Sequence, residues 1–210
     1  NICTLTVNRP KQYNALNQCV LEELDETIKK IKTDINCRAI IITGAGDRAF
    51  IAGADIREMR KMDVATAQKF SKYGQNITKK IENMHIPVIA AINGFAIGGG
   101  CEFAMSCHIR YASTNAIFSQ PEVTLGLIAG FGGTQRLPRL IGKGRAMELL
   151  LSGKQINADE AHAIGLVNKI FKTHELLPKA KELALLISKN APLAIAKTIE
   201  SINEGYGKNF

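Results

Sequence analysis

The residues best suited to chemistry in this chain are a glutamate and the three consecutive glycines just before it. Gly98–Gly100 end an apolar stretch, and Glu102 follows them at what the pattern predicts to be the first turn of a helix. Three glycines remove every side chain from the turn, so its backbone N–H groups are open to close approach. The N-terminus of a helix also leaves N–H groups unpaired and carries the positive end of the dipole. Such a turn can hold an anion, or an oxygen that becomes anionic in a reaction, and Glu102 beside it suggests proton transfer.

A second glutamate, Glu122, follows Pro121, and the proline indicates a turn or an extended stretch rather than a helix interior. Each glutamate also has a plainer structural interpretation. Glu102 can simply complement a helix dipole, which contributes about 0.3–1 kcal/mol, and Glu122 can be a solvated loop acid. Taken singly, each residue favours its structural interpretation.

A second loop of small residues, Ala52-Gly53-Ala54-Asp55, resembles the glycine turn because it lies between an apolar strand and a helix. It too can present bare N–H groups, although a tight connection with Asp55 as the helix N-cap explains it equally well. Two such loops in one domain can supply two donors to a single carbonyl oxygen. Losing one donor of an oxyanion hole costs on the order of 3–4 kcal/mol of transition-state stabilisation.

The other reactive side chains indicate neither a metal site nor nucleophilic hydrolysis. The histidines have no metal-ligand spacing, and no serine or cysteine stands in a GxSxG context. Five cysteines without a CxxC pair argue against a disulfide framework or a zinc site and favour a reducing compartment. The histidines are His85, His108, His162 and His174.

Length and charge set broad limits. A chain of 210 residues predicts one domain, or a domain with a small appendage, with a substantial core and no apolar run long enough to span a bilayer. The sequence shows no signal peptide, and because Asn1 opens almost inside a strand we expect the natural N-terminus to lie upstream. The formal charge of +8 fits a lysine-rich surface, a phosphate-bearing cofactor or a nucleic acid, and charge alone does not separate these.

Strands alternating with helices along the chain predict an α/β architecture. The region 48–55 is expected to be a loop, and the chain becomes helical from Gly142. The expected strands are 4–8, 38–43, 87–92, 109–112, 116–118 and 166–171. The expected helices are 17–32, 56–62, 64–84, one from the glycine turn through 106, 144–151, 158–164, 176–189 and 192–203.

Five motifs in register over nearly the whole chain resemble the enoyl-CoA hydratase (crotonase) family. They are NRPKQYNALN at 8–17, AFIAGADIREM at 49–59, PVIAAINGFAIGGGCEFAMSC at 87–107, FSQPEVTLGLIAGFGGTQRLPRLIG at 118–142 and GLVNKIF at 165–171. The resemblance implies a crotonase-like (ClpP/crotonase) spiral of ββα units with a helical C-terminal region. It divides the chain into a spiral core with the active site, 1–142, and a helical region, 143–210, that supports oligomerisation and is truncated.

The resemblance also implies roles for individual residues. The N–H groups of Ala54 and Gly99 would form an oxyanion hole for a thioester carbonyl. Glu102 would act as base and Glu122 as acid on one water, and Gly130 would help to position that water. The implied contacts to the substrate and its CoA portion are Ala15, Ala52, Gly53, Asp55 and Arg57.

The presence of both acids favours a hydratase, which adds water to a trans-2-enoyl-CoA in syn fashion and gives a (3S)-3-hydroxyacyl-CoA. Crotonyl-CoA is the type of short-chain substrate expected, in fatty-acid oxidation or butanoate metabolism. The alternatives are an enoyl-CoA isomerase, which would need only one acid, another acyl-CoA enzyme of the family, an RNA-binding relative, or an inactive truncated homologue. Basic residues spread along the chain disfavour nucleic acid.

The expected partners are an acyl-CoA substrate and further copies of the chain, as a trimer or a dimer of trimers, with no membrane. No metal and no cofactor beyond the CoA of the substrate is expected. The expected location is the cytoplasm, or the mitochondrial matrix of a eukaryote. The chain departs from the family pattern at His108, where aspartate is common, at Ala129, where proline is usual, and in ending at Phe210.

Overall fold

Two sheets form the centre of the molecule. The structure is a computed structural model, and it describes residues 1–206. The larger sheet has the strand order β1 (Ile2–Val7), β2 (Ala39–Gly44), β4 (Val88–Ile92), β6 (Ile109–Ser113), β9 (Lys169–Phe171), with every neighbouring pair parallel. The smaller sheet has the order β3 (Ala49–Ile51), β5 (Phe95–Ile97), β7 (Ile117–Ser119), β8 (Gln155–Asn157), and only β8 is antiparallel to its neighbour.

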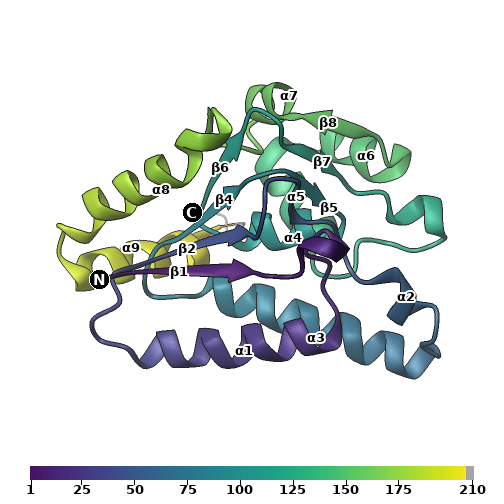
Figure 1. Cartoon of the computed structure of the whole chain (residues 1–210), viewed down its shortest axis with the longest axis horizontal. Helices are drawn as coiled ribbons and strands as arrows, with labels where there is room; N and C mark the ends of the chain where they lie inside the picture. The colour runs from purple at the N-terminus through teal and green to yellow at the C-terminus, as the bar shows by residue number, and fades with distance from the viewer. Residues whose placement is uncertain (207–210) are drawn as a thin grey trace.

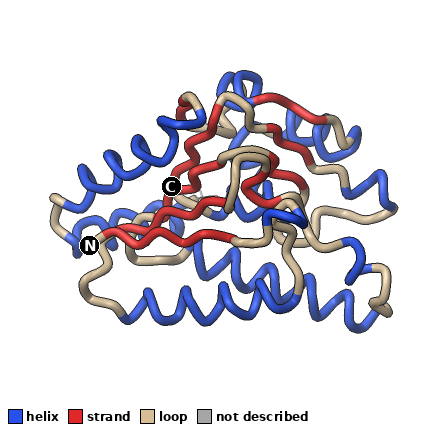
Figure 2. The backbone as a smooth tube through the Cα atoms, in the orientation of Figure 1, coloured by secondary structure: helices blue, strands red, loops and turns tan. Residues whose placement is uncertain are grey.

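The chain builds these sheets as a spiral. The successive pairs β2 and β3, β4 and β5, and β6 and β7 each place one strand in the larger sheet and the next in the smaller sheet. Helices complete the turns and surround the strands (Figures 1 and 2). They are η1 (Pro10–Gln12), α1 (Gln18–Thr33), α2 (Ile56–Met59), α3 (Val64–Glu82), α4 (Gly99–Ser106), η2 (Glu122–Leu125), α5 (Gly133–Ile141), α6 (Lys143–Ser152), α7 (Ala158–Ala163), α8 (Thr173–Ser188) and α9 (Pro192–Gly205).

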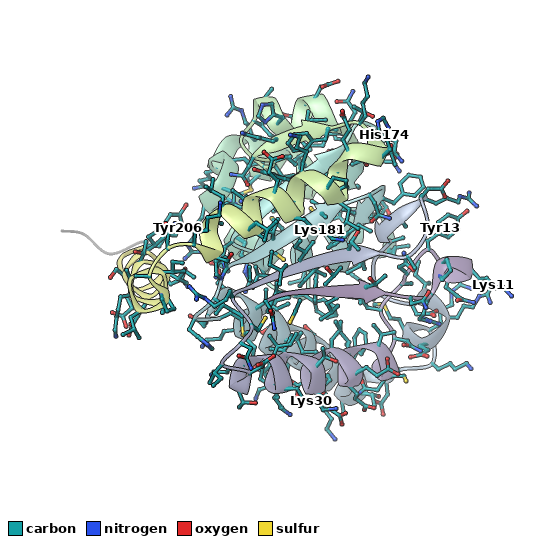
Figure 3. All side chains as sticks on the ribbon, turned by 60° about the vertical axis from the view of Figure 1, so that its left-hand side comes forward. Lys11, Tyr13, Lys30, His174, Lys181 and Tyr206 are labelled. Atoms are coloured by element: carbon teal, nitrogen blue, oxygen red, sulfur yellow. The ribbon has the colours of Figure 1, made fainter. Side chains whose placement is uncertain are left out.

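The central strands β2 and β4 of the larger sheet are buried on both faces, which explains their nearly continuous apolar sequences. Alternate residues point to opposite sides of a strand. Ile40 and Ile42 accordingly belong to the core formed with α1 and α3, whereas Ile41 packs with Leu176 and Ala180 of α8. Figure 3 shows α8, which carries Lys181, lying across the strands, with α1 and Lys30 on the far side of the sheet.

The structure differs from the sequence prediction at the short strands. The region 48–55, expected to be a loop, contains β3, and β5 and β8 were not expected either. Each of these strands has three residues, too few to show a periodic pattern, and each exists because a neighbouring strand pairs with it.

The C-terminal region shares both sheets with the preceding part of the chain. Strand β8 pairs with β7, and β9 pairs with β6, so residues 143–206 complete the sheets as well as adding helices. Residues 207–210 of this region lie outside the described residues. Within residues 1–206, no helix combines the length and the apolar composition needed to cross a membrane.

Candidate active site

The turn before α4 accepts only glycine at two of its positions. Gly98 has φ +50° and ψ −120°, and a Cβ there would lie 2.8 Å from Oε1 of Glu122. A Cβ on Gly100 would lie 1.8 Å from the carbonyl oxygen of Ile51. The glycines therefore let the start of α4 approach both β3 and the second glutamate.

Two unpartnered N–H groups meet at this turn, those of Ala54 and Gly99. The Ala54 loop is clamped by Leu16, whose N–H donates to the Gly53 carbonyl and whose carbonyl accepts from the N–H of Asp55, both at 2.8 Å. A Cβ on Gly99 would lie 3.7 Å from the Ala54 nitrogen, so the two backbones are neighbours. Among residues 1–206 neither N–H donates a hydrogen bond to another group. Together they can donate to one oxygen.

Glu102 is fixed in the first turn of α4 with only 1% of its surface exposed. Its Oε1 accepts hydrogen bonds from the N–H groups of Phe131 at 2.8 Å and Gly133 at 2.7 Å. Burial and, to a smaller extent, the charge of Glu122 raise the pKa of Glu102, while the two N–H donors and Arg136 lower it, and the net pKa is about 7. A carboxyl with a pKa near neutrality can both take and give a proton.

Glu122 is the first residue of η2, directly after Pro121. Burial raises the pKa of this carboxyl as well. The side-chain amide of Gln120, oriented with its nitrogen towards Glu122, donates to both carboxylate oxygens at 3.1 Å. The second glutamate is therefore held from its own strand–turn connection, on the side of the turn where Gly98 leaves space.

One cleft of about 1810 Å³ collects most of the predicted site residues. Ala15 is buried, and Asp55 caps α2 and forms an ion pair with Arg9 at 3.1 Å; neither residue lines the cleft. Arg57 is exposed and also lies outside the lining, whereas Arg60 belongs to it. The predicted residues that line the cleft are Ala52, Gly53, Ala54, Gly99, Glu102, Glu122 and Gly130.

Several polar contacts at the site were not predicted. The N–H donors of Phe131 and Gly133, and the Gln120 amide, were all missed. The carbonyl of Gly130 is fixed by Ser71 and Gln75 of α3, both at 2.8 Å. A glycine-rich turn preceding a helix signals available N–H groups, but nothing in the sequence says which side chain accepts from them.

The two departures from the family pattern have defined surroundings. Ala129 is buried in the cleft lining, and a Cβ on Gly133 would lie 3.0 Å from its methyl group. His108 accepts from the N–H of Val88 through Nδ1 at 2.9 Å, so Nε2 is the protonated nitrogen and donates to the carbonyl of Glu82 at 3.0 Å. Burial lowers the pKa of His108, which keeps the imidazole neutral in this role.

Comparisons with known proteins agree with this architecture. The model of the enoyl-CoA hydratase/isomerase family matches residues 1–209. A short-chain-enoyl-CoA hydratase of Clostridium acetobutylicum is 51% identical over 204 residues, which are 97% of this chain and 78% of that protein. A crotonyl-CoA hydratase of Syntrophomonas wolfei is 49% identical over the same length, with the same shares covered. The crystal structure of an enoyl-CoA hydratase from Bacillus anthracis has a TM-score of 0.97 and 41% identity, and covers 99% of this chain and 81% of that one.

The spiral of paired strands defines a crotonase-type α/β protein. The chain belongs to the enoyl-CoA hydratase/isomerase family, because the family model covers nearly all of it and relatives about half identical match it almost end to end.

Proposed function

We propose that this protein is an enoyl-CoA hydratase that adds water reversibly to short trans-2-enoyl-CoA thioesters. The observation that carries the proposal is the presence of Glu102 and Glu122 in one cleft with the adjacent, unpartnered N–H groups of Ala54 and Gly99. This arrangement offers two proton-transferring carboxyls beside a site for a developing oxyanion. The relatives named as short-chain and crotonyl-CoA hydratases support the same reaction.

In the proposed mechanism the thioester oxygen accepts hydrogen bonds from Ala54 and Gly99. A water lies between the two carboxyls, placed with the help of Gly130. Glu102 takes a proton as the water oxygen bonds to C3, and Glu122 delivers a proton to C2 on the same face. Electrons of the double bond pass through the thioester enolate, whose negative oxygen the two N–H groups stabilise. The product is a (3S)-3-hydroxyacyl-CoA, and holding water and alkene together removes much of the entropic cost of addition.

The reaction requires the carboxyl pair to carry one proton. Burial raises both pKa values, and because that of Glu102 is about 7, the pair can hold one proton near neutral pH. Two ionised carboxylates would lack the acid, and two protonated carboxyls would lack the base. The fraction of active enzyme at a given pH therefore depends on the titration of the two carboxyls as a pair, more than on that of either residue alone.

The rest of the substrate is proposed to occupy the same cleft. An apolar pocket of about 410 Å³ adjoins Glu122 and includes Ala129, Pro138 and Ala146, which suits a short acyl chain. The CoA portion would pass Ala52 and Gly53 in the cleft wall, with Ala15, Asp55 and Arg57 nearby as proposed contacts. The chemistry needs no cofactor beyond the CoA of the substrate.

The proposal extends to a cytoplasmic or mitochondrial-matrix enzyme in which 1–142 carries both carboxyls and both N–H donors, and 143–210 supports oligomerisation while also contributing Ala146 to the acyl pocket. Exposed apolar side chains on α8 and α9, among them Leu186 and Leu193, support self-association into a trimer or a dimer of trimers. Sizing chromatography checks this part, and a stable monomer contradicts it.

The purified chain is expected to hydrate crotonyl-CoA with a bell-shaped dependence of kcat/KM on pH. Activity falls at low pH because the pair becomes doubly protonated and Glu102 cannot act as base. It falls again at higher pH because the pair loses its last proton and Glu122 has none to deliver, and the pKa of Glu102, about 7 in the free site, places this loss near neutrality. The measurement is loss of the enoyl-thioester absorbance across the pH range. Conversion of a 3-enoyl-CoA without hydration would indicate an isomerase instead, and salt-sensitive RNA retention without turnover would indicate a binding protein.

A further inference from the structure

Arg136 forms a network behind the turn that holds Glu102. It lies in the first turns of α5, and its side chain is 13% exposed. Its Nη2 and Nε donate to the two carboxylate oxygens of Glu82 at 2.9 and 3.3 Å. Its Nη1 donates to the carbonyl of Phe131 at 2.9 Å and contacts the hydroxyl of Thr78 at 3.3 Å. The Thr78 hydroxyl donates to the same carbonyl at 3.1 Å. A charged, forked side chain thus fixes one backbone carbonyl.

That carbonyl lies between the two peptide groups that serve Glu102. The N–H groups of Phe131 and Gly133 belong to the peptides before and after the one that contains the Phe131 carbonyl. Because the middle peptide is held by Arg136 and Thr78 on one side, its two neighbours are left presenting their N–H groups to Glu102. Rotation of the middle peptide would break the bonds to Arg136 and misplace both donors.

The surrounding residues show that the network is built closely around Arg136. Gly132 has φ +107°, and a Cβ there would lie 2.4 Å from Nη1 of Arg136. Glu82, the anchor of the Arg136 side chain, is itself fixed. Its backbone carbonyl accepts from Nε2 of His108 at 3.0 Å and from Nδ2 of Asn203 at 2.7 Å. Glu82, the last residue of α3, is therefore held by His108 and by a residue of α9 where Arg136 meets it (Figure 1).

We propose that Arg136 is a positioning residue for Glu102, acting through the 131–133 turn and through its positive charge. This inference deepens the proposed hydratase function, and its kinetic readout rests on that function. Arg136 touches neither carboxyl of the pair by hydrogen bond; it fixes the donors that orient Glu102 and helps to set how readily Glu102 ionises.

The charges around Glu102 determine the direction of the effect. Glu122 from η2 raises the pKa of Glu102, and Arg136 from α5 lowers it. Cys101 on its own helix remains a neutral thiol because burial raises its pKa to about 12. Glu82 from α3 is paired with Arg136, while β3 and β5 contribute no ionisable side chain. Removing the charge of Arg136 therefore raises the pKa of Glu102.

The variants R136Q and R136K separate the two parts of this role. R136Q removes the charge and most of the fork, so the alkaline limb of the pH profile and the 13C carboxyl titration of Glu102 both move to higher pH. R136K keeps the charge but loses the fork, so the titration stays near that of the unmodified protein while kcat falls. A misplacement of about 1 Å costs on the order of 10²-fold, so we expect kcat losses of roughly 10- to 100-fold with little change in KM. Glu102→Gln assigns the NMR signal.

The control is R145Q, because Arg145 of α6 is exposed and lies outside the lining of both the cleft and the apolar pocket. It is expected to leave kcat, the pH profile and the titration unchanged. Glu82→Gln, which weakens the anchor and leaves the charge, provides a second test if R136Q does not fold, and should lower kcat less than R136K.

The possible outcomes separate this inference from the proposed function. If the unmodified protein does not hydrate crotonyl-CoA, the proposed function fails, while the titration of Glu102 in R136Q still decides the electrostatic part of the inference. A Glu102 titration that does not move in R136Q overturns the inference even if kcat falls, because a purely structural loss would lower kcat without shifting that pKa. Normal kcat in both R136K and Glu82→Gln overturns the positioning part.

Discussion

Replacing Glu102 with glutamine is expected to lower kcat for crotonyl-CoA hydration by about 10³-fold, within the 10²- to 10⁴-fold range of acid–base catalysis. Glutamine preserves the shape of the side chain, and its amide oxygen can still accept from Phe131 and Gly133. The fold and the turn should therefore survive, and KM should change little. What is lost is the group that takes a proton from water. Steady-state kinetics with circular dichroism as a folding check measures the effect.

Glu122→Gln is expected to cause a loss of the same order, because the second carboxyl supplies the proton for C2 in the proposed mechanism. The matched control is Glu148→Gln, since Glu148 is a glutamate of α6 that pairs with Lys154 at 2.8 Å on the surface. If either active-site variant keeps nearly full activity, the two-acid mechanism is wrong. A strict need for only one of the two would favour an isomerase.

Much of the fold could be predicted because its long elements have strong local signals. The buried strands β2 and β4 are continuous apolar runs, and α1 begins where Asn17 accepts from the N–H of Val20, as an N-cap does. Asp55, predicted as a possible N-cap, does cap α2 by accepting from the N–H of Arg57. The strands β3, β5 and β8 could not be predicted in this way, since only pairing with distant strands defines them.

The candidate site was predictable to a similar degree. Small residues and glycines identify backbone that can be approached, so both loops of the N–H pair were found from sequence. Their meeting depends on packing: Gly100 approaches Ile51, and Leu16 clamps the Ala54 loop. The donors to Glu102 were missed because a glycine-rich turn signals available N–H groups without indicating which side chain accepts from them. The positioning role of Arg136 could not be predicted either, because it depends on a hydrogen bond to the backbone carbonyl of Phe131, which the sequence does not reveal.

The proposed oxyanion hole can be tested by a substitution that places a single methyl group in it. A Cβ on Gly99 would lie 3.7 Å from the Ala54 nitrogen and 3.2 Å from the Phe131 ring. The ring has to shift by a few tenths of an ångström, which the fold tolerates at a cost of about 1–3 kcal/mol. The methyl group would crowd the position where a carbonyl oxygen accepts from both N–H groups. Gly99→Ala is therefore expected to lower kcat/KM by about 10²- to 10³-fold, the loss typical of one donor of such a hole.

Two other glycine-to-alanine substitutions serve as comparisons for this prediction. Gly144→Ala adds the same methyl group in α6, where nothing lies within 4 Å, and should leave kcat/KM unchanged. Gly100→Ala would place its Cβ 1.8 Å from the carbonyl oxygen of Ile51, so it should impair folding itself, visible as a lower melting temperature. A folded Gly99→Ala protein with unchanged kcat/KM would remove Gly99 from the hole. A folded Gly99→Ala protein that has lost kcat/KM, while Gly144→Ala has kept it, would tie the loss to a methyl group at the Gly99 position.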